Sequence, residues 1–320
     1  MLYPILLVSI LFIKKLFAIF NLYDILLRKN LKVDKNMSFF NLFKEKIIEP
    51  VVHENEQGLT LLEGAHILIN CNRVKLDGSA VVLESHNSSY DSVKGKAKIQ
   101  ILNGGKIKEV SGKVKIGIIK DTYIAVIKDK VQITTINSCA IDYVKGNVSI
   151  KTFNNGSIKF LDGKSHIDTM NNGKILFIRG RCKIGTVNNG YIEGLMDNAQ
   201  ISTLQNGKIN YLLNKSAIGT INSCQINEIC DDVEIGTLED GIINLIVGNS
   251  MVCQQMGGKI VSKQEGVIIV YSYKKDNKPK SSRKYEVKLK SEKKESTNDE
   301  QINKIDIAEQ TSLLDLEDNK

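Results

Sequence analysis

Few residues of this chain have the types and spacing that catalysis requires. The four histidines, His53, His66, His86 and His166, are scattered with no partner constellation around any of them, and His166 with Asp168 is the best acid–base candidate. Residues i and i+2 of a strand project from the same face, so this pair could exchange a proton. No nucleophile and no pocket motif accompanies the pair. We therefore expect a solvated surface pair and no enzyme.

Six cysteines could act as nucleophiles, metal ligands or disulfide partners: Cys71, Cys139, Cys182, Cys224, Cys230 and Cys253. They show no CxxC spacing and no regular pairing, and neither they nor the histidines supply a zinc-ligating cluster. Isolated free thiols favour a reducing compartment. Phosphate-binding and metalloprotease spacings are also missing, so we expect no metal and no cofactor.

A strict repeat fixes where these residues must lie. From Ala80 to Gly266 the sequence divides without insertion into lines of 17 residues, such as VSIKTFNNGSIKFLDGK and SHIDTMNNGKILFIRGR. Position 3 of each line is Ile or Val, position 11 is Ile after Tyr90, and position 14 is apolar until Lys263. The apolar runs are β-branched and are broken by Asn-Gly pairs, which accept positive φ, and a 17-residue line is too short for two helices. The sequence predicts an all-β fold, a single-stranded parallel β-helix (β-solenoid) of about 11–12 coils with 17 residues per coil.

Two polar columns recur along the repeat. Position 5 is Thr in seven successive coils from Thr135 to Thr237, and we expect its hydroxyls to bond to one another or to the turn backbone. An amide ladder is expected from the pairs Asn154–Asn155, Asn171–Asn172 and Asn188–Asn189. A ligand-binding Thr array, as on ice-binding solenoids, is the functional alternative. Such surfaces usually need more than the one Thr that recurs in each coil here.

Positive charge gathers in the turn at positions 15–17 of the repeat. The net charge is +8 and the pI is near 9.0, which points to an acidic partner. Stacked coils would align a basic edge: Lys113, Lys128, Lys130, Lys145, Lys164, Arg179 and Arg181. The edge is either a solvated corner or a strip that docks on anionic lipid or another acidic polymer. It lacks the interleaved aromatic residues of single-stranded nucleic acid binding, so no nucleic acid is expected.

The sequence changes character on both sides of the repeat. We expect four regions: an apolar segment over 1–36, a linker with a short amphipathic segment over 37–62, the solenoid over 63–273, and a disordered charged tail over 274–320. The run Leu2 to Ile13 is too short to span a bilayer comfortably. The first segment is therefore a membrane-seated helix, an atypical signal anchor, or an over-extended start before Met37. In the tail, Leu313 to Glu317 resembles a clathrin-box peptide, although five-residue motifs also arise by chance.

The ends of the repeat carry the signals for assembly. A solenoid end exposes unpaired strand edges, which must be capped or used. Lys263 breaks the apolar pattern at the C-terminal end, and a partial cap is plausible from Glu63, where the register is lost. An apolar strand then resumes, and we expect self-association, head to tail or tail to tail, through Val267, Ile268, Ile269 and Val270.

The repeat lines, for example CKIGTVNNGYIEGLMDN and AQISTLQNGKINYLLNK, resemble bactofilins when taken with the free cysteines, the small apolar N-terminal segment and the charged tail. The resemblance implies a cytoskeletal scaffold of bacteria, with a right-handed β-helix that polymerises end to end at the membrane. The implied partners are further copies of the chain and an anionic membrane, and the implied location is the cytoplasmic face of that membrane. Bactofilin cores are shorter than this repeat and have Pro-rich flanks. No individual site residue carries over.

The NNG-x-I-x-x-L pattern is also similar to the β-strand repeats of bacterial surface adhesins. That similarity implies the alternative function, an extracellular or surface-exposed adhesin or coat protein that binds a partner along its solenoid face. Adhesins are normally secreted, which the free thiols and the absence of an ordinary signal peptide oppose.

Overall fold

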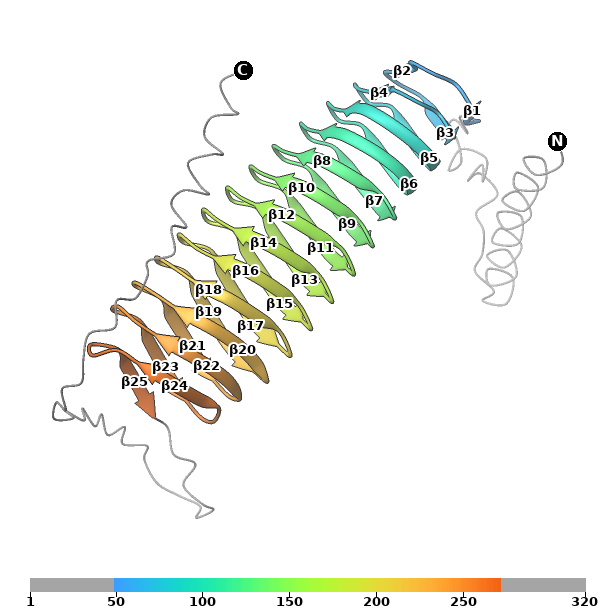
Figure 1. The fold of residues 1–320 in the computed structure, drawn as a ribbon. Coiled ribbons are helices and arrows are strands. Elements are labelled where there is room, and N and C mark those ends of the chain that lie inside the picture. Colours follow the sequence, from blue (N-terminus) through green and yellow to red (C-terminus); the bar gives the residue numbers. More distant parts are fainter. Residues whose placement is uncertain (1–48, 272–320) are drawn as a thin grey trace, which may run out of the picture.

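The computed structural model describes residues 49–271 as one elongated stack of strands (Figure 1). The strands form a single parallel sheet that winds into a β-solenoid of about 13 turns, which confirms the predicted fold class. Within the described range no helix is long and apolar enough to cross a membrane. The predicted segment 1–36, the tail 274–320 and the motif Leu313–Glu317 lie outside the described residues.

Each coil contributes one strand to each of two faces, which we name face A and face B. Face A contains β1 (Val51–Glu54), β3 (Ala65–Ile69), β7 (Lys115–Lys120), β9 (Gln132–Asn137), β11 (Ser149–Asn154), β13 (His166–Asn171), β15 (Lys183–Asn188), β17 (Gln200–Gln205), β19 (Ala217–Asn222), β21 (Glu234–Leu238), β23 (Met251–Gln255) and β25 (Ile268–Tyr271). Face B contains β2 (Thr60–Leu61), β4 (Val74–Leu76), β8 (Tyr123–Ile127), β10 (Ala140–Val144), β12 (Ser157–Leu161), β14 (Lys174–Ile178), β16 (Tyr191–Leu195), β18 (Lys208–Leu212), β20 (Cys224–Ile229), β22 (Gly241–Ile246) and β24 (Lys259–Lys263). Two long strands, β5 (Val81–Val93) and β6 (Lys98–Val110), run through both faces.

The strand register confirms the 17-residue repeat. Ile116 pairs with Ile99 and with Ile133, so each residue stands beside its equivalent in the next coil. The register is different at the N-terminal end, where Val51 pairs with His66, a step of 15 residues. A bulge between β3 and β5 then brings the step to 17. Strand pairing thus begins at Val51, inside the stretch 37–62 that the sequence predicted to be a linker.

Six positions of each coil point into the solenoid. In the coil that contains β9 and β10, these buried residues are Val131, Ile133, Ile136, Cys139, Ile141 and Val144. The predicted Ile columns, at positions 3 and 11, and the aliphatic column at position 14 are therefore core. Positions 1, 6 and 9 are core as well, and the sequence did not reveal them. Each face bends, so two consecutive residues point outward between positions 3 and 6 and again between 11 and 14.

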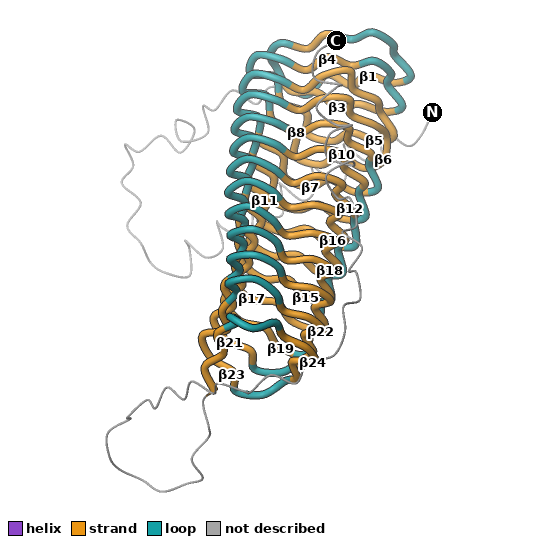
Figure 2. The backbone as a smooth tube through the Cα atoms, turned by 60° about the vertical axis from the view of Figure 1, so that its left-hand side comes forward, coloured by secondary structure: helices purple, strands orange, loops and turns teal. Residues whose placement is uncertain are grey.

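The turns stack on one another along the solenoid, as Figure 2 shows for the loops at its edges. Backbone amides of one coil donate to carbonyls of the neighbouring coil within these turns, for example Lys164 N to Gly146 O at 2.6 Å. The turns thereby extend the parallel pairing of the strands, which satisfies their backbone polar groups.

The Asn-Gly turns have the positive φ that the sequence predicted, and one residue of each pair supplies it. Positive φ belongs to the Asn, at 51° for Asn155 and 50° for Asn172, and not to the Gly that follows each of them. A Cβ on Gly173 would lie 2.8 Å from Met170 Cγ and 2.8 Å from Phe153 Cε1. The glycine is therefore required by the large buried side chains at position 6, and Asn supplies the left-handed backbone.

Candidate functional site

The His166–Asp168 pair lies on the outer surface of β13, as predicted. His166 Nε2 is 2.6 Å from Asp168 Oδ1, and their side chains are 43% and 50% exposed. His166 Nδ1 is 3.1 Å from the carbonyl of Lys183 in the next coil. Both ring nitrogens thus have acceptors beside them, which fixes the ring against the strand and leaves neither nitrogen free to act on a substrate.

The cysteines are free, and their chemistry is suppressed. Cys71, Cys139, Cys182 and Cys224 are buried. Burial raises the pKa of Cys182 to about 12, and burial followed by the neighbouring Glu228 raises that of Cys230 to about 12. A thiol needs a lowered pKa to be a good nucleophile at neutral pH, so Cys182 and Cys230 are not activated, and the four buried cysteines fill the core as small side chains.

Neither a metal cluster nor an enclosed pocket emerges from the part of the chain that the structure covers. No three His, Cys, Asp or Glu side chains converge in it as metal ligands. One shallow hollow in it is open to solvent and is lined by the turns of four successive coils, which contain Gly190, Gly207, Cys224 and Gly241. It holds no catalytic pair.

The predicted basic edge forms, because the turns between face B and face A stack in register. Two of its members are neutralised: Lys128 Nζ lies 3.1 Å from Glu109, and Arg179 lies 3.2 Å from Asp162. Five have no ion-pair partner among residues 49–271 and are exposed: Lys113, Lys130, Lys145, Lys164 and Arg181. The edge is thus a row of solvated cations beside a row of paired ones.

An aromatic column beside this edge was missed by the sequence analysis. At position 13, the rings of Tyr143 and Phe160 stack at a centroid distance of 5.0 Å, and those of Phe160 and Phe177 at 5.7 Å. The guanidinium of Arg179 lies 5.4 Å from the Phe160 centroid. Aromatic residues therefore do accompany the basic edge, contrary to the prediction. Because the rings cover one another's faces, they do not offer the open stacking surfaces that nucleotide bases need.

The two polar columns differ in outcome. The amide ladder is present: the side-chain amides of Asn154, Asn171 and Asn188 each donate to the preceding coil at 2.8–2.9 Å, and the row begins at Asn137. The Thr residues stand side by side, as in Thr152 beside Thr135. Their expected hydroxyl bonds are not found in the described part of the chain, so that part of the prediction is wrong. The Thr column is a half-buried packing stripe.

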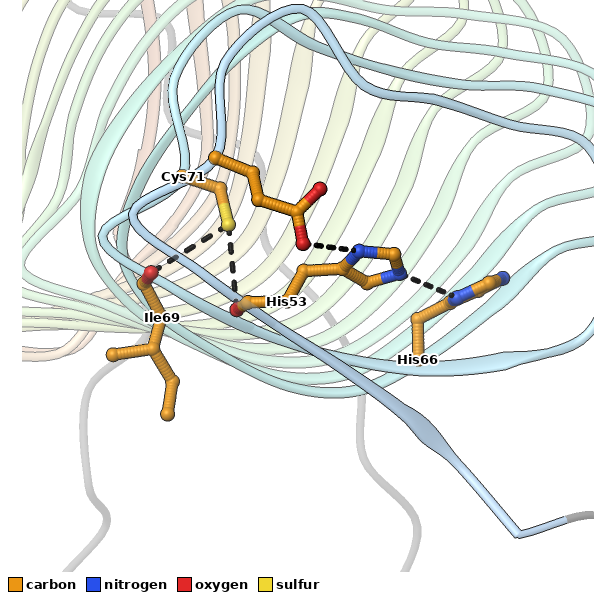
Figure 3. Close-up of polar contacts among 5 residues, drawn as sticks. His53, His66, Ile69 and Cys71 are labelled. Carbon is orange, nitrogen blue, oxygen red and sulfur yellow. Dashed lines mark hydrogen bonds and ion pairs between the residues drawn. The ribbon is translucent and has the colours of Figure 1, made fainter. Parts of the chain in front are cut away.

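The two N-terminal histidines meet, although the sequence placed them apart. His53 Nε2 lies 3.2 Å from His66 Nδ1 (Figure 3), and His53 Nδ1 lies 3.0 Å from Glu56 Oε1. His66 Nε2 donates to Glu63 O at 2.7 Å. The prediction that no partners surround any histidine is therefore wrong for this pair. The irregular 15-residue step hid the contact, since the two residues are 13 positions apart.

The predicted self-association segment continues the solenoid. Val267 occupies the position 1 core column and is 8% exposed, while Ile268 is 52% exposed. Ile269 pairs with Val252 and packs against the core. The outer edge of β25 is free of strand partners within the described residues. The backbone edge of β25 is therefore open for association, whereas only some of the four predicted side chains are exposed.

Comparison with known proteins found no family model, no curated protein and no solved structure that matches this chain.

Proposed function

We propose that this chain is a non-enzymatic structural scaffold that polymerises end to end, as bactofilins do. The observation that carries the proposal is the unbroken parallel pairing from β1 to β25, which leaves an unpaired strand edge at each end of the described solenoid. Open edges of this kind template further strand pairing.

Apolar side chains accompany both edges. At the N-terminal end Val51, Val52 and Leu62 are 54%, 45% and 58% exposed. At the C-terminal end Ile268 and Tyr271 are 52% and 53% exposed. Burying these side chains between two copies adds hydrophobic stabilisation to the backbone hydrogen bonds of the edges.

The charges of the two ends favour head-to-tail contact. Glu54, Glu56 and Glu63 are exposed at the N-terminal end. Lys259 and Lys263 are exposed on β24 and outnumber Glu265 at the C-terminal end. Opposite charges meet when β25 and β24 of one copy face β1 and β2 of the next, whereas tail-to-tail contact places lysines together. A heterologous contact of this kind generates an open filament.

A scaffold role without catalysis is supported by what the candidate sites lack. His166 and Asp168 lie on an open surface, and the cysteines with shifted pKa values are held as thiols. The six free thiols also support a reducing location, and we propose the cytoplasmic face of a membrane.

The test is the mass distribution of the full chain in sedimentation velocity and light scattering, with negative-stain microscopy of the same samples. We expect concentration-dependent polymers in the wild type. Ile268→Lys places a charge at the open edge and should shift the distribution to monomers at least tenfold, with an unchanged β-sheet circular dichroism spectrum. The matched control is Ile101→Lys, an outward residue of β6 that is 36% exposed and far from the C-terminal edge.

A strictly monomeric wild type at high concentration would contradict the scaffold proposal. The alternative, a surface adhesin or coat protein, is favoured by one observation, the outward aromatic column Tyr143, Phe160 and Phe177. Such a column lies along one face, where a long partner could bind.

A further inference from the structure

Imidazoles enter the interior of the described solenoid only at its N-terminal end, whereas the buried polar residues of later coils are serines and one threonine, such as Ser165, Ser216 and Ser250. His66 pairs with Val82, in a column that carries Ile or Val in the next eleven coils, and is 8% exposed. His53 pairs with Leu68, another core residue, and its side chain is 13% exposed. Two imidazoles thus stand at the N-terminal mouth in columns that apolar side chains mostly fill in later coils.

One nitrogen of each ring already makes a hydrogen bond to a glutamate. Glu63 O can only accept a hydrogen bond, so His66 Nε2, at 2.7 Å, carries the proton. The ionised Glu56 carboxylate also only accepts, so His53 Nδ1, at 3.0 Å, carries a proton too. In neutral rings with these tautomers, the other two nitrogens, His53 Nε2 and His66 Nδ1, hold lone pairs.

These two lone-pair nitrogens point at each other across 3.2 Å, as Figure 3 shows. Two lone pairs that face each other repel, and a cation between the rings, either an extra proton or a metal ion, removes this repulsion. With metal–nitrogen bonds of about 2.05 Å, as for Zn²⁺, a separation of 3.2 Å corresponds to a ligand–metal–ligand angle of about 103°. That angle is close to tetrahedral.

We propose that His53 Nε2 and His66 Nδ1 bind a divalent transition-metal ion, Zn²⁺ by preference, with water in the remaining positions. Imidazole nitrogen suits this class of ion. Glu56 and the Glu63 carbonyl act as the partners that orient ligating histidines, through the nitrogen that does not face the metal. The Cys71 thiol, which donates to His53 O at 3.4 Å, holds the backbone of the first coil in place.

The charge of the mouth supports a cation. Glu54, Glu56 and Glu63 are exposed there and make the local potential negative. A polar cap alone would need hydrophilic side chains, but it would not need two oriented lone pairs directed at one point. The site goes beyond the proposed scaffold function, and its test does not depend on assembly.

The experiment is isothermal titration of the full chain, without a histidine tag, with Zn²⁺ at neutral pH. We expect one saturable site per chain, weakened at least tenfold by His66→Gln or His53→Gln. His166→Gln is the matched control, since His166 also contacts a carboxylate and a carbonyl but stands alone. Absence of saturable binding, or equal binding in His66→Gln, overturns the proposal and leaves a shared proton between the rings.

A second measurement keeps the test independent of how the variants fold. Long-range ¹H–¹⁵N spectra of the wild type report the state of each imidazole nitrogen. Zn²⁺ should shift the signals of His53 Nε2 and His66 Nδ1 and leave those of His86 and His166 in place. Shifts of the other histidines alone would count against the site.

Discussion

Asn171 shows how much a single outward side chain can add to a repeated structure. Its amide donates to Asn154 Oδ1 at 2.9 Å, and its own carbonyl accepts from Asn188 at 2.9 Å. An amide can both donate and accept in such a row, whereas the carboxylate of the same shape can only accept. Its neighbour Asn172 has another task, since its backbone adopts a φ of 50° and its side chain is exposed. Of these two adjacent asparagines, the first is needed for its side-chain hydrogen bonds and the second for its backbone conformation.

We predict that Asn171→Asp lowers the stability of the solenoid and that Asn172→Asp does not. The first substitution removes the bond to Asn154 and sets two acceptors against each other, at a cost of about 1–3 kcal/mol. The second keeps a residue type that adopts positive φ elsewhere in the chain, as Asp129 does at 69°. Chemical denaturation at neutral pH, followed by circular dichroism, compares the two. Equal losses would mean that the ladder adds nothing specific.

At the scale of the element, the side-chain volumes at the six interior positions of a coil depend on one another. Positions 3, 11 and 14 could be predicted because nearly every coil repeats the same residue type there. Positions 1, 6 and 9 could not, because their residues vary together. Position 6 holds Phe153 or Met170 where position 9 is Gly, but Ile221 where position 9 is Cys224. A larger side chain at position 6 is thus matched by a smaller one at position 9, and this relation is not visible in either column alone.

The same limit explains the N-terminal coils. The 17-residue register begins at Ala80, since the earlier coils advance by 15 or 16 residues. The strands Val51–Glu54 and Ala65–Ile69 therefore could not be aligned with the 17-residue columns from the sequence. The contact between His53 and His66 could not be predicted without that alignment.

Exchange of volume between columns makes a specific prediction. Gly173→Cys should destabilise the chain by about 1–3 kcal/mol, because the new side chain meets Met170 and Phe153. In a Phe153→Leu, Met170→Ile background the same substitution should cost less than about 1 kcal/mol, because that set copies the natural trio Leu204, Ile221 and Cys224. Denaturation midpoints of the four proteins give the coupling. An equal cost in both backgrounds would show that the glycine is required by the backbone and not by the volume of its neighbours.

At the scale of the whole molecule, the solenoid is a rod whose ends and flank have separate tasks. The ends carry open strand edges with complementary charge, and the flank carries the stacked basic edge. In the proposed filament, growth would use only the ends, so every added copy would extend the row of exposed cations along the side. Such a polymer would multiply weak electrostatic contacts to an anionic surface, even where one copy binds poorly.

If the chain attaches to a membrane, as we propose, the first 46 residues and the basic edge are the two candidate sites, and we predict that the first 46 residues dominate. Phe39, Phe40 and Phe43 adjoin Lys44 and Lys46, a composition that suits insertion into an anionic interface. A chain that begins at Glu49 retains the whole of β1 and should keep its polymers but lose co-sedimentation with anionic liposomes. The matched control is the full chain with its five unpaired edge cations changed to Gln, and it should still bind. If the truncated chain binds and the edge variant does not, attachment belongs to the flank of the filament, and each added copy would strengthen it.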